Sequence, residues 1–509
     1  MIDATSWAVI APELVLLTLA CVVTLADLWV KHPQRGLTYW LTQITLTLLV
    51  LWQAGHARTL SNPDMHKAAY GFGGMVVADA FGAWLKCAAT LALMVALVYA
   101  RPYSTERQMV KRGGELYILA LFALLGVYIT AAGNHFLVIY LGLELTALAS
   151  FAMVALRRNH ALSAEAGMKY FILGSLASGF LLYGLSMLYG ATGAMHLPLL
   201  QESVLRGIGS KGVLMLGLVF VVAGLAFKLA AAPFHMWVPD VYQGAPTSIT
   251  LIIATAPKLA VFAVLVRLLV GGLLDLASQW QLMLVVLAVC SLLLGNIAAT
   301  LQHNVKRMLA YSTIAQNGFL LLVFAVSYVN GNNYLLKDAL AASMFYMLTY
   351  VLAALVAFGV LMLLSGENVE CETLDDLRGL NHRHPVYAGI MALAMLSLAG
   401  VPLTVGFYAK FRIIQVLLMA QTGLHVGLAI FAVLTAVIGA FYYIRIIKVM
   451  YFDEPVHPEE WSVAHRTDAH AMLSINGALL VVLGILPAGL LRLCDEAVLN
   501  MLRHMSGMQ

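Results

Sequence analysis

The chain has 509 residues, of which 62% are hydrophobic and only 11% are charged. Because a soluble domain carries about 25% charged residues, this composition predicts an all-α polytopic membrane protein and excludes a soluble domain of any size. The net charge of +4 is small and scattered among the predicted loops, which argues against nucleic acid as a partner.

Apolar stretches recur along the whole chain. A membrane-spanning helix needs about 20 mostly apolar residues, and on that basis the sequence predicts about fourteen spans. Prolines inside the seventh and twelfth predict that these two helices are broken within the membrane. The predicted spans are Trp7–Trp29, Thr38–Gly55, Met75–Ala100, Glu115–Ala132, His135–Leu156, Ala164–Gly190, Gly212–Val241, Ser248–Val270, Gln279–Leu301, Val305–Tyr328, Tyr334–Leu364, Pro385–Leu418, Gly423–Phe452 and His470–Leu493.

Basic residues in the loops predict the orientation of the chain. With both termini on the non-cytoplasmic side, about fifteen basic residues lie inside and about eight, Arg267 among them, lie outside, as the positive-inside rule requires. No basic leader precedes the first apolar stretch, so we expect an uncleaved span there. The longest polar stretches are Gly366–His384 and Asp453–Arg466. The acidic residues of the first form either a docking surface for a partner or a solvated linker.

The segment Gly224–Thr247, GLAFKLAAAPFHMWVPDVYQGAPT, begins as a span but contains Lys228, Pro233 and His235. A proline in a helix removes a backbone hydrogen bond, and irregular backbone inside a membrane survives only when it is buried in protein or lines a wet cavity. A lysine beside such a break is a candidate functional residue. His235 is either part of that site or a hydrogen-bonded packing residue.

Several other charges fall inside the predicted spans. Glu144, in VIYLGLELTALAS, is the only acidic residue that we expect deep in the first half, and a lysine is its natural partner. Each charge at a helix centre costs roughly 2.5–3.5 kcal/mol, so the pair serves either packing or proton transfer. Asp79 and Lys86 are too far apart on one helix to touch, and we interpret them as packing or interface residues. The basic residues left in the spans are Lys86, Lys169, Lys228, Lys258, Lys410 and Arg412.

The local context of these lysines differs. Lys258 follows Pro257 directly, and Lys410 follows the proline break in SLAGVPLTVGFYAKFR. Two interrupted spans, one in each half, are typical of an ion site in a transporter built from repeats. Lys169 stands only two turns into its span, so it either reaches the inside surface with its long side chain or contributes to the site.

No residue pattern predicts a cofactor or a metal. The five cysteines form no C-x-x-C pair and no zinc or iron–sulfur spacing, so we expect them to be buried apolar residues. No phosphate-binding loop, dinucleotide-binding glycine pattern or haem motif is present. Any redox chemistry in which the protein takes part is therefore expected in other chains.

The charged segments, taken in order, resemble the antiporter-like subunits of proton-pumping NADH:quinone oxidoreductase, respiratory complex I. The matching pieces run from about residue 140 to residue 412. They are LGLEL, MKYFILGS, FKLAAAPFHMWVPDVYQGAPT, APKLAVFAVLVR, HNVKRMLAYSTIAQNGF and AGVPLTVGFYAKF. Of the family's three such subunits, one carries a long C-terminal lateral helix and another a glutamate at the position of Lys410. This sequence has neither feature, which favours the third.

The resemblance implies two inverted five-helix bundles, spans four to eight and nine to thirteen, each with a discontinuous helix. The expected segments are an N-terminal three-helix segment (1–114), a first bundle broken near Pro233 (115–270), a second bundle broken near Pro402 (277–452) and a C-terminal loop with the last helix (453–509). The implied proton-transfer residues are Glu144 and Lys228 as a modulating pair, Lys258 as a central relay, Lys410 facing the other end of the channel, and Lys169 and His235 in less defined roles.

The resemblance further implies a translocase subunit without a redox site of its own. NADH, FMN, iron–sulfur clusters and quinone would bind partner subunits. The partners would be other membrane-arm subunits, in the lipid bilayer of a bacterial-type inner membrane. Two alternatives stay open: a cation/proton antiporter subunit outside a redox complex, and a structural spacer whose charges only hold helices together.

Overall fold

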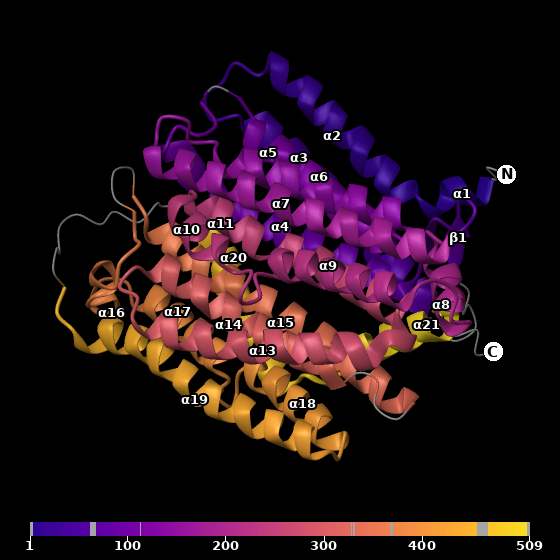
Figure 1. The fold of residues 1–509 in the computed structure, drawn as a ribbon. Coiled ribbons are helices and arrows are strands. Elements are labelled where there is room, and N and C mark those ends of the chain that lie inside the picture. The colour runs from indigo at the N-terminus through magenta and orange to yellow at the C-terminus, as the bar shows by residue number, and fades with distance from the viewer. Residues whose placement is uncertain are drawn as a thin grey trace.

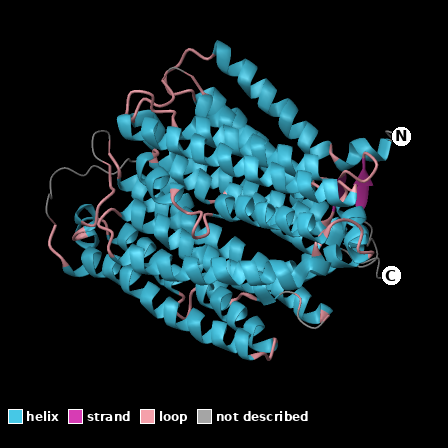
Figure 2. Cartoon of the chain, in the orientation of Figure 1, coloured by secondary structure: helices cyan, strands magenta, loops and turns pink. Residues whose placement is uncertain are grey.

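The computed structural model describes residues 4–61, 68–111, 113–326, 328, 331–366, 370–455 and 467–505. Nearly all of these residues are helical (Figure 2), which confirms the predicted fold class. Within this part of the chain, twelve helices are long and apolar enough to span a membrane. The less apolar Gly36–Ser61 and a pair of shorter helices flanking Gly400 complete the predicted set of spans. Most of the predicted loop Asp453–Arg466 lies outside the described residues.

The elements follow one another in short connections. A two-stranded antiparallel hairpin, β1 (Ala69–Gly71) and β2 (Val76–Ala78), precedes α4. The helices are α1 (Ala4–Val9), α2 (Ala11–Trp29), α3 (Gly36–Ser61), α4 (Ala80–Glu106), α5 (Glu115–Ala132), α6 (Phe136–Val154), α7 (Ala161–Thr192), α8 (Leu197–Leu205), α9 (Lys211–Leu229), α10 (Trp237–Gly244), α11 (Thr247–Ala254), α12 (Ala256–Val264), α13 (Ala277–Thr300), α14 (Val305–Val326), α15 (Asn333–Leu364), α16 (Leu380–Arg383), α17 (Pro385–Ala399), α18 (Val405–Met419), α19 (Gly423–Phe452), α20 (Thr467–Ile485) and α21 (Ala488–Met505).

The long helices run side by side (Figure 1), so charged residues gather at two ends. We call one the basic end, where Arg157, Lys306 and Arg307 lie, and the other the opposite end, where Asp79 and Arg267 lie. The first and last helices, α1 and α21, both lie at the opposite end (Figure 1). The prediction that the chain starts and finishes on one side of the membrane agrees with this arrangement.

Two helices are interrupted midway, as the prolines predict. The α9 helix ends at a left-handed residue, Ala230, with φ 69°, and α10 continues after a short irregular stretch. In the second half α17 ends at Gly400, with φ 87°, and α18 continues. A left-handed residue is a common helix stop. The α9–α10 pair runs toward the basic end and the α17–α18 pair runs away from it, so the two interrupted helices are antiparallel.

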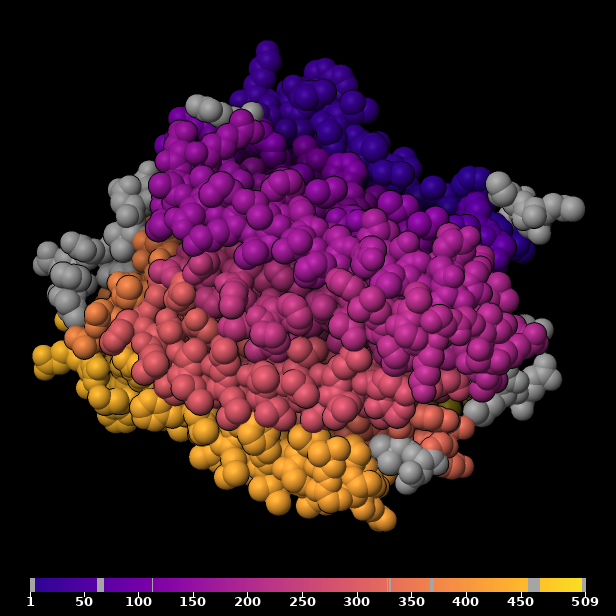
Figure 3. Space-filling model, viewed as in Figure 1, coloured from indigo at the N-terminus to yellow at the C-terminus, as the bar shows by residue number. Residues whose placement is uncertain are grey.

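The neighbours of the two interrupted helices correspond. In the first half α5 packs on α6 and α12, and α7 packs on α9 and α10. In the second half α13 packs on α14 and α19, and α15 packs on α17 and α18. The order of neighbours is thus the same in both halves while the chain direction is reversed. This is the arrangement expected of two inverted five-helix bundles, stacked one above the other in Figure 1 and in the space-filling view of Figure 3.

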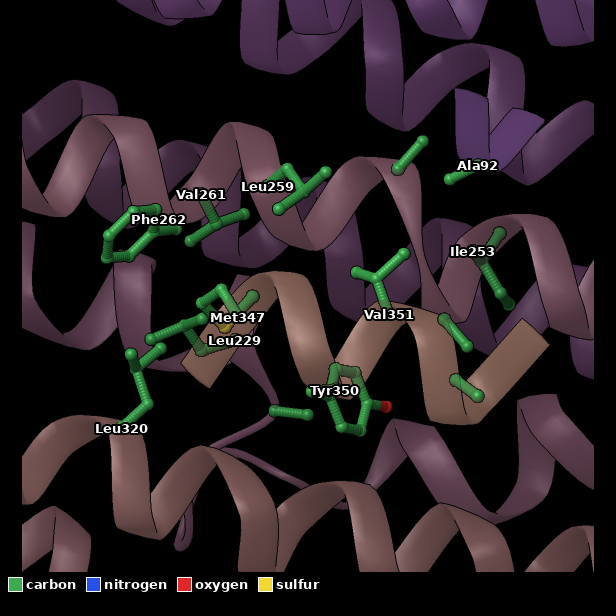
Figure 4. Packing of buried hydrophobic residues seen from close by; sticks show 14 of the residues in the cluster. Ala92, Leu229, Ile253, Leu259, Val261, Phe262, Leu320, Met347, Tyr350 and Val351 are labelled. Carbon is green, nitrogen blue, oxygen red and sulfur yellow. The ribbon is translucent and has the colours of Figure 1, made fainter. Parts of the chain in front are cut away.

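The core lies where the two bundles meet. Almost every residue of α11, α12, α14 and α15 is buried, and Figure 4 shows part of the apolar cluster that these helices share. In contrast α6, α7, α13 and α19 expose leucine, isoleucine and valine side chains outward, as expected for helices that face lipid. The polar site described below is therefore enclosed by apolar side chains.

The last predicted span, His470–Leu493, is wrong at its C-terminal side. The α20 helix ends at Ile485, and α21 begins at Ala488 after Pro487. The sequence of α21 is amphipathic, and it packs against α3, α4 and α15 at the opposite end. Its Asn500 amide donates to the carbonyl of Leu60 at 3.0 Å. The predicted span continued past Pro487 because the residues on both sides of it are largely apolar. In the structure this proline separates two helices.

Candidate proton-transfer site

The predicted partner of Glu144 is confirmed in geometry. The Lys228 Nζ lies 3.2 Å from Glu144 Oε1, and both side chains are largely enclosed by protein. Ser178 of α7 joins them, because its hydroxyl donates to Glu144 and accepts from Lys228 at 3.1 Å. The α6, α7 and α9 helices thus each contribute one member. A hydroxyl between the two charges provides a hydrogen-bonded bridge that survives small changes in their separation.

Lys228 is next to the end of α9, where the break leaves backbone carbonyls without helical partners. Trp237 Nε1 donates to the carbonyl of Phe227 at 3.0 Å. Lys258 Nζ donates to the carbonyls of Lys228 and Leu229 at 3.2 and 3.0 Å. Lys258 is 1% exposed. Because it binds the last carbonyls of α9, its Nζ lies at the negative end of the α9 dipole. The end of the broken helix is therefore the direct binding partner of the second lysine.

Lys258 makes one further contact, with the face of an aromatic ring. Its Nζ is 5.4 Å from the Trp237 ring centroid, a distance at which a cation is attracted by the ring. The same indole stacks on Tyr170 of α7, with centroids 4.5 Å apart and planes 10° apart. Phe227 also stacks on this indole, with ring centroids 5.5 Å apart. Aromatic rings thus hold the indole in place beside the lysine.

The second broken helix repeats this arrangement. Lys410 Nζ donates to the carbonyls of Leu398 and Ala399, the last residues of α17, at 2.7 and 3.0 Å. It also lies 4.9 Å from the ring centroid of Phe319. In each bundle, then, a buried lysine binds the carbonyls at the end of the interrupted helix and the face of an aromatic ring.

Two consecutive residues of α14 connect the two lysine sites. The Asn317 amide donates to the carbonyl of Leu229, which Lys258 also binds. The Gln316 amide donates to the carbonyl of Leu398 at 3.0 Å. Sequence reasoning missed both residues, although they stand as two adjacent amides in the mostly apolar segment STIAQNGFLLL. An amide inside an apolar span is the signal that would have found them.

Gln316 belongs to a larger polar group at the centre of the second bundle. Its amide also donates to the Tyr443 hydroxyl of α19 at 3.0 Å, and the Tyr346 hydroxyl of α15 donates to its carbonyl oxygen. Tyr443 in turn bonds Ser312 of α14. Hydroxyl and amide groups that both donate and accept form a continuous chain through an apolar core, where each of them would be costly if left unpaired.

Small cavities adjoin both lysine sites. A cavity of about 40 Å³ is lined by Lys228, Thr146 and Ser150, among others. A second, of about 20 Å³, is lined by Lys410, Gln316 and others. A water molecule needs about 10–15 Å³ of such space together with polar partners. Each cavity therefore has the size and the polar lining to hold at least one water.

The comparisons with known proteins agree with this geometry. A family model described as "NADH:quinone oxidoreductase/Mrp antiporter, TM" matches residues 133–439. NADH-quinone oxidoreductase subunit N of Polaromonas naphthalenivorans is 54% identical over 98% of each chain. The chain belongs to the subunit N family. It is thus an integral membrane protein, as the composition predicts, and the predicted resemblance is confirmed.

Solved structures give the same fold for the subunit N family. A chain of respiratory complex I from Thermus thermophilus is 32% identical, covers 95% of this chain and 99% of its own length, and superposes with a TM-score of 0.76. A chain of the Mrp complex from Dietzia superposes with a TM-score of 0.81 over 97% of both chains at 18% identity. At that identity the likeness extends to the fold alone, so the alternative of a free-standing antiporter is not favoured.

Two predicted site residues, Lys169 and His235, lie apart from the Glu144–Lys228 pair. Lys169 contacts Asp240 at 2.9 Å and Glu165 at 2.8 Å, and its side chain is 41% exposed near the basic end. Asp240 also binds Arg307 of α14 at 2.7 Å. His235 is buried in the irregular stretch after α9, and its Nδ1 has no hydrogen-bond partner in the described part of the chain. The structure brings neither residue to Glu144.

The expectation that Glu144 is the only acidic residue deep in the first half is wrong. Glu13 of α2, which sequence reasoning overlooked, pairs with Lys86 of α4 at 2.5 Å, so Glu144 is not the only deep acidic residue of the first half. Asp79, at the N-terminus of α4, binds Arg267 through two hydrogen bonds of 2.8 and 3.0 Å. Arg267 was expected in an outside segment but is 1% exposed.

Two of the five lysines predicted inside the spans have no carboxylate partner in the described part of the chain. Among the described residues, Lys258 and Lys410 contact no carboxylate within 4 Å. They bind only backbone carbonyls and ring faces. This separates them from Lys86, Lys169 and Lys228, each of which has a carboxylate partner.

At the basic end, Glu370 of the predicted acidic loop connects the two bundles instead of facing solvent. Its carboxylate accepts from the hydroxyls of Tyr103 and Thr247, at 2.5 and 2.8 Å, and lies 3.7 Å from Lys306 and 3.5 Å from Arg157. Burial alone would raise the pKa of this carboxyl, but the Lys306 ammonium and the two hydroxyls outweigh it and lower the pKa to about 2. Glu370 is therefore ionised and holds three helices, α4, α11 and α14, and the α6–α7 connection at one point.

Proposed function

We propose that this chain translocates protons in the membrane arm of an NADH-quinone oxidoreductase and carries no redox centre itself. The observation that carries the proposal is the repeated lysine site. Lys258 and Lys410, one in each bundle, are buried with no carboxylate within 4 Å among the described residues, and they are linked through Gln316 and Asn317. Relatives named as subunits of that enzyme support the assembly. NADH, FMN, iron–sulfur clusters and quinone then bind partner subunits.

The proposed route begins at the Glu144–Lys228 pair. A charged lysine inside a protein is stabilised by a carboxylate more strongly than by carbonyl dipoles. While the pair is closed, the carboxylate holds a proton on Lys228. A rearrangement elsewhere in the complex that separates the pair removes this stabilisation. The proton of Lys228 then moves to Lys258, which accepts it as a neutral amine after passing its own proton on toward Lys410.

The second part of the route crosses from one bundle to the other. Lys258 and Lys410 share the amides of α14, and the hydroxyls of Tyr346 and Tyr443 and the adjoining cavities supply further proton carriers. Moving one charge against the membrane potential costs about 2.3 kcal/mol per 100 mV. A change of one unit in the pKa of a single group corresponds to about 1.4 kcal/mol. A shift of about two pKa units in a proton-carrying group is therefore of the size needed to move one proton against 100 mV. No covalent chemistry is required.

The proposed orientation places the basic end on the cytoplasmic side. The arginines and lysines near the ends of α4, α6 and α14 that lie at the basic end support it through the positive-inside rule. Attachment of a thiol-reactive, membrane-impermeant label to single cysteines tests it. Cysteine at Lys448, exposed at the C-terminal end of α19, is expected to react from the cytoplasmic side only, and reaction from the other side contradicts the orientation.

Purification of the tagged chain in mild detergent tests the assembly. The proposal predicts that flavin-containing and iron–sulfur subunits copurify and that the sample oxidises NADH with a quinone. A complex of cation/proton antiporter subunits without flavin or iron–sulfur clusters would contradict it. Replacement of Glu144 by Gln in the same preparation tests the route, since it is expected to lower NADH-driven proton uptake into vesicles while the complex stays assembled.

A further inference from the structure

A large cavity opens at the basic end, away from the lysine sites. Its volume is about 700 Å³, within the range of about 300–1,000 Å³ found for small-ligand sites. It lies where the α4–α5 connection meets the α6–α7 connection. Its single acidic group is Glu115, the first residue of α5. Its basic groups are Arg107, Lys111, Arg157, Arg158 and His160. The cavity thus carries a strong excess of positive charge.

Two of these cations, Lys111 and Arg158, have no carboxylate partner among the described residues. Arg157 is 3.5 Å from the Glu370 carboxylate. Lys111 Nζ donates to the side-chain oxygen of Gln108 at 3.3 Å. Among the described residues, no carboxylate lies within 4 Å of Lys111 or Arg158. Two cations with no carboxylate partner in the described part of the chain, Lys111 and Arg158, attract an anion with several acceptor oxygens, such as a phosphate ester.

The surface beneath the cavity is apolar. Leu137, Leu141 and Leu148 of α6 are 47%, 62% and 54% exposed and follow one face of the helix. The helix ends at Val154, and Leu156 immediately after it lines the cavity. A strip of exposed leucines therefore leads from the membrane interior up to the cationic cavity.

We propose that this cavity binds the phosphate headgroup of an anionic phospholipid, with the acyl chains lying along the leucine strip of α6. The two observations fit one molecule, because such a lipid joins a phosphate anion to long apolar chains. An acidic segment of a protein partner would match the cations but would leave the leucine strip unexplained. Basic pockets between spanning helices are known to recruit anionic headgroups in this way.

The test compares lipid retention by purified complexes. Wild type and the double variant Lys111→Gln/Arg158→Gln are delipidated in detergent and then titrated with dioleoyl phosphatidylglycerol, dioleoyl phosphatidylcholine or inorganic phosphate. Bound lipid is counted by native mass spectrometry. Each cation at a membrane surface contributes about 1 kcal/mol, or roughly five-fold in affinity. The double variant is therefore expected to bind phosphatidylglycerol at least ten-fold more weakly, while phosphatidylcholine and inorganic phosphate bind neither protein.

A matched control removes the same charge elsewhere on the basic end. Arg378 and Lys448 both lie near Asp453, far from the cavity in the other half. The Arg378→Gln/Lys448→Gln variant is expected to bind phosphatidylglycerol as wild type does. Equal binding by the cavity variant and wild type would overturn the proposal. So would occupation by inorganic phosphate alone, or loss of a neighbouring subunit from the cavity variant with unchanged lipid content.

Discussion

Gln316 and Asn317 are neighbours on α14, yet their side chains bind opposite halves of the molecule. Asn317 donates to the carbonyl of Leu229, and Gln316 donates to the carbonyl of Leu398. Each carbonyl also accepts from the buried lysine of its own bundle. Two adjacent amides on one rigid helix therefore connect the end of one broken helix to the end of the other. A displacement of α14 affects both lysine sites at once.

Replacement of Asn317 by Leu tests this connection. The leucine keeps the size of the side chain but leaves the Leu229 carbonyl to Lys258 alone, at a cost of about 1 kcal/mol. We expect assembly to be normal and NADH-driven proton uptake to fall roughly five-fold. Asn476→Leu is the matched control, since Asn476 is equally buried but lies on α20 and bonds only Tyr99. Equal effects of the two variants would contradict the connection.

Loss of the Glu144 charge is expected to lower coupled turnover more than loss of the Ser178 bridge. Glu144→Gln removes the charge that stabilises the lysine and is expected to lower coupled turnover about ten-fold or more, equivalent to about 1.4 kcal/mol in the barrier. Ser178→Ala removes only the bridge and leaves the 3.2 Å ion pair, so its effect is expected to be smaller. NADH oxidation in sealed vesicles measures both. A stronger effect of Ser178→Ala would show that the bridge, and not the charge, controls the pair.

The Glu13–Lys86 pair is expected to be structural. It joins α2 to α4 outside the two bundles. Glu13→Gln alone leaves a buried ammonium without its partner and is expected to lower the assembled fraction, because breaking a buried pair costs about 3–5 kcal/mol. Glu13→Gln with Lys86→Met is expected to restore assembly and to pump normally. Normal assembly of the double variant with a loss of pumping would show that the pair takes part in proton transfer.

Glu370 is expected to give the basic end a stability that depends on pH. Its folded pKa of about 2 is below the ordinary value of 4.5, so the unfolded state binds the proton more readily. Its contribution is therefore present above about pH 4.5 and is lost as the pH falls toward 2. Glu370→Gln is expected to lower the thermal unfolding temperature of the complex at pH 7 and to reduce the difference at pH 3. The exposed Asp375→Asn serves as the control, and an equal effect of both would contradict the assignment.

The sequence predicts local backbone features of this fold better than contacts between distant segments. The spans and the two breaks follow from apolar length and from Pro233 and Pro402, because both act through the backbone locally. The Glu144–Lys228 pair was predicted since few carboxylates lie that deep. The partners of Lys258 were not predicted, because they are backbone carbonyls, which every residue carries and which only the break exposes.

Two ion pairs were not predicted because their partners are far apart in the sequence. Glu13 stands in the first turn of α2, where an acidic residue is ordinary, so nothing in the sequence indicates that α4 lies against it. Arg267 is near the end of its span and was assigned to the surface, but the Asp79 carboxylate at the start of α4 holds it inside. Both contacts join segments far apart in the sequence.

The most direct test of the account is proton translocation by Lys410→Met and Lys258→Met variants of the assembled complex, reconstituted in vesicles and driven by NADH. Lys86→Met combined with Glu13→Gln is the matched control, because it also removes a buried lysine. The account predicts that proton uptake falls about ten-fold or more in both single variants and stays at the wild-type level in the control. Wild-type uptake in fully assembled Lys258→Met and Lys410→Met complexes would contradict it.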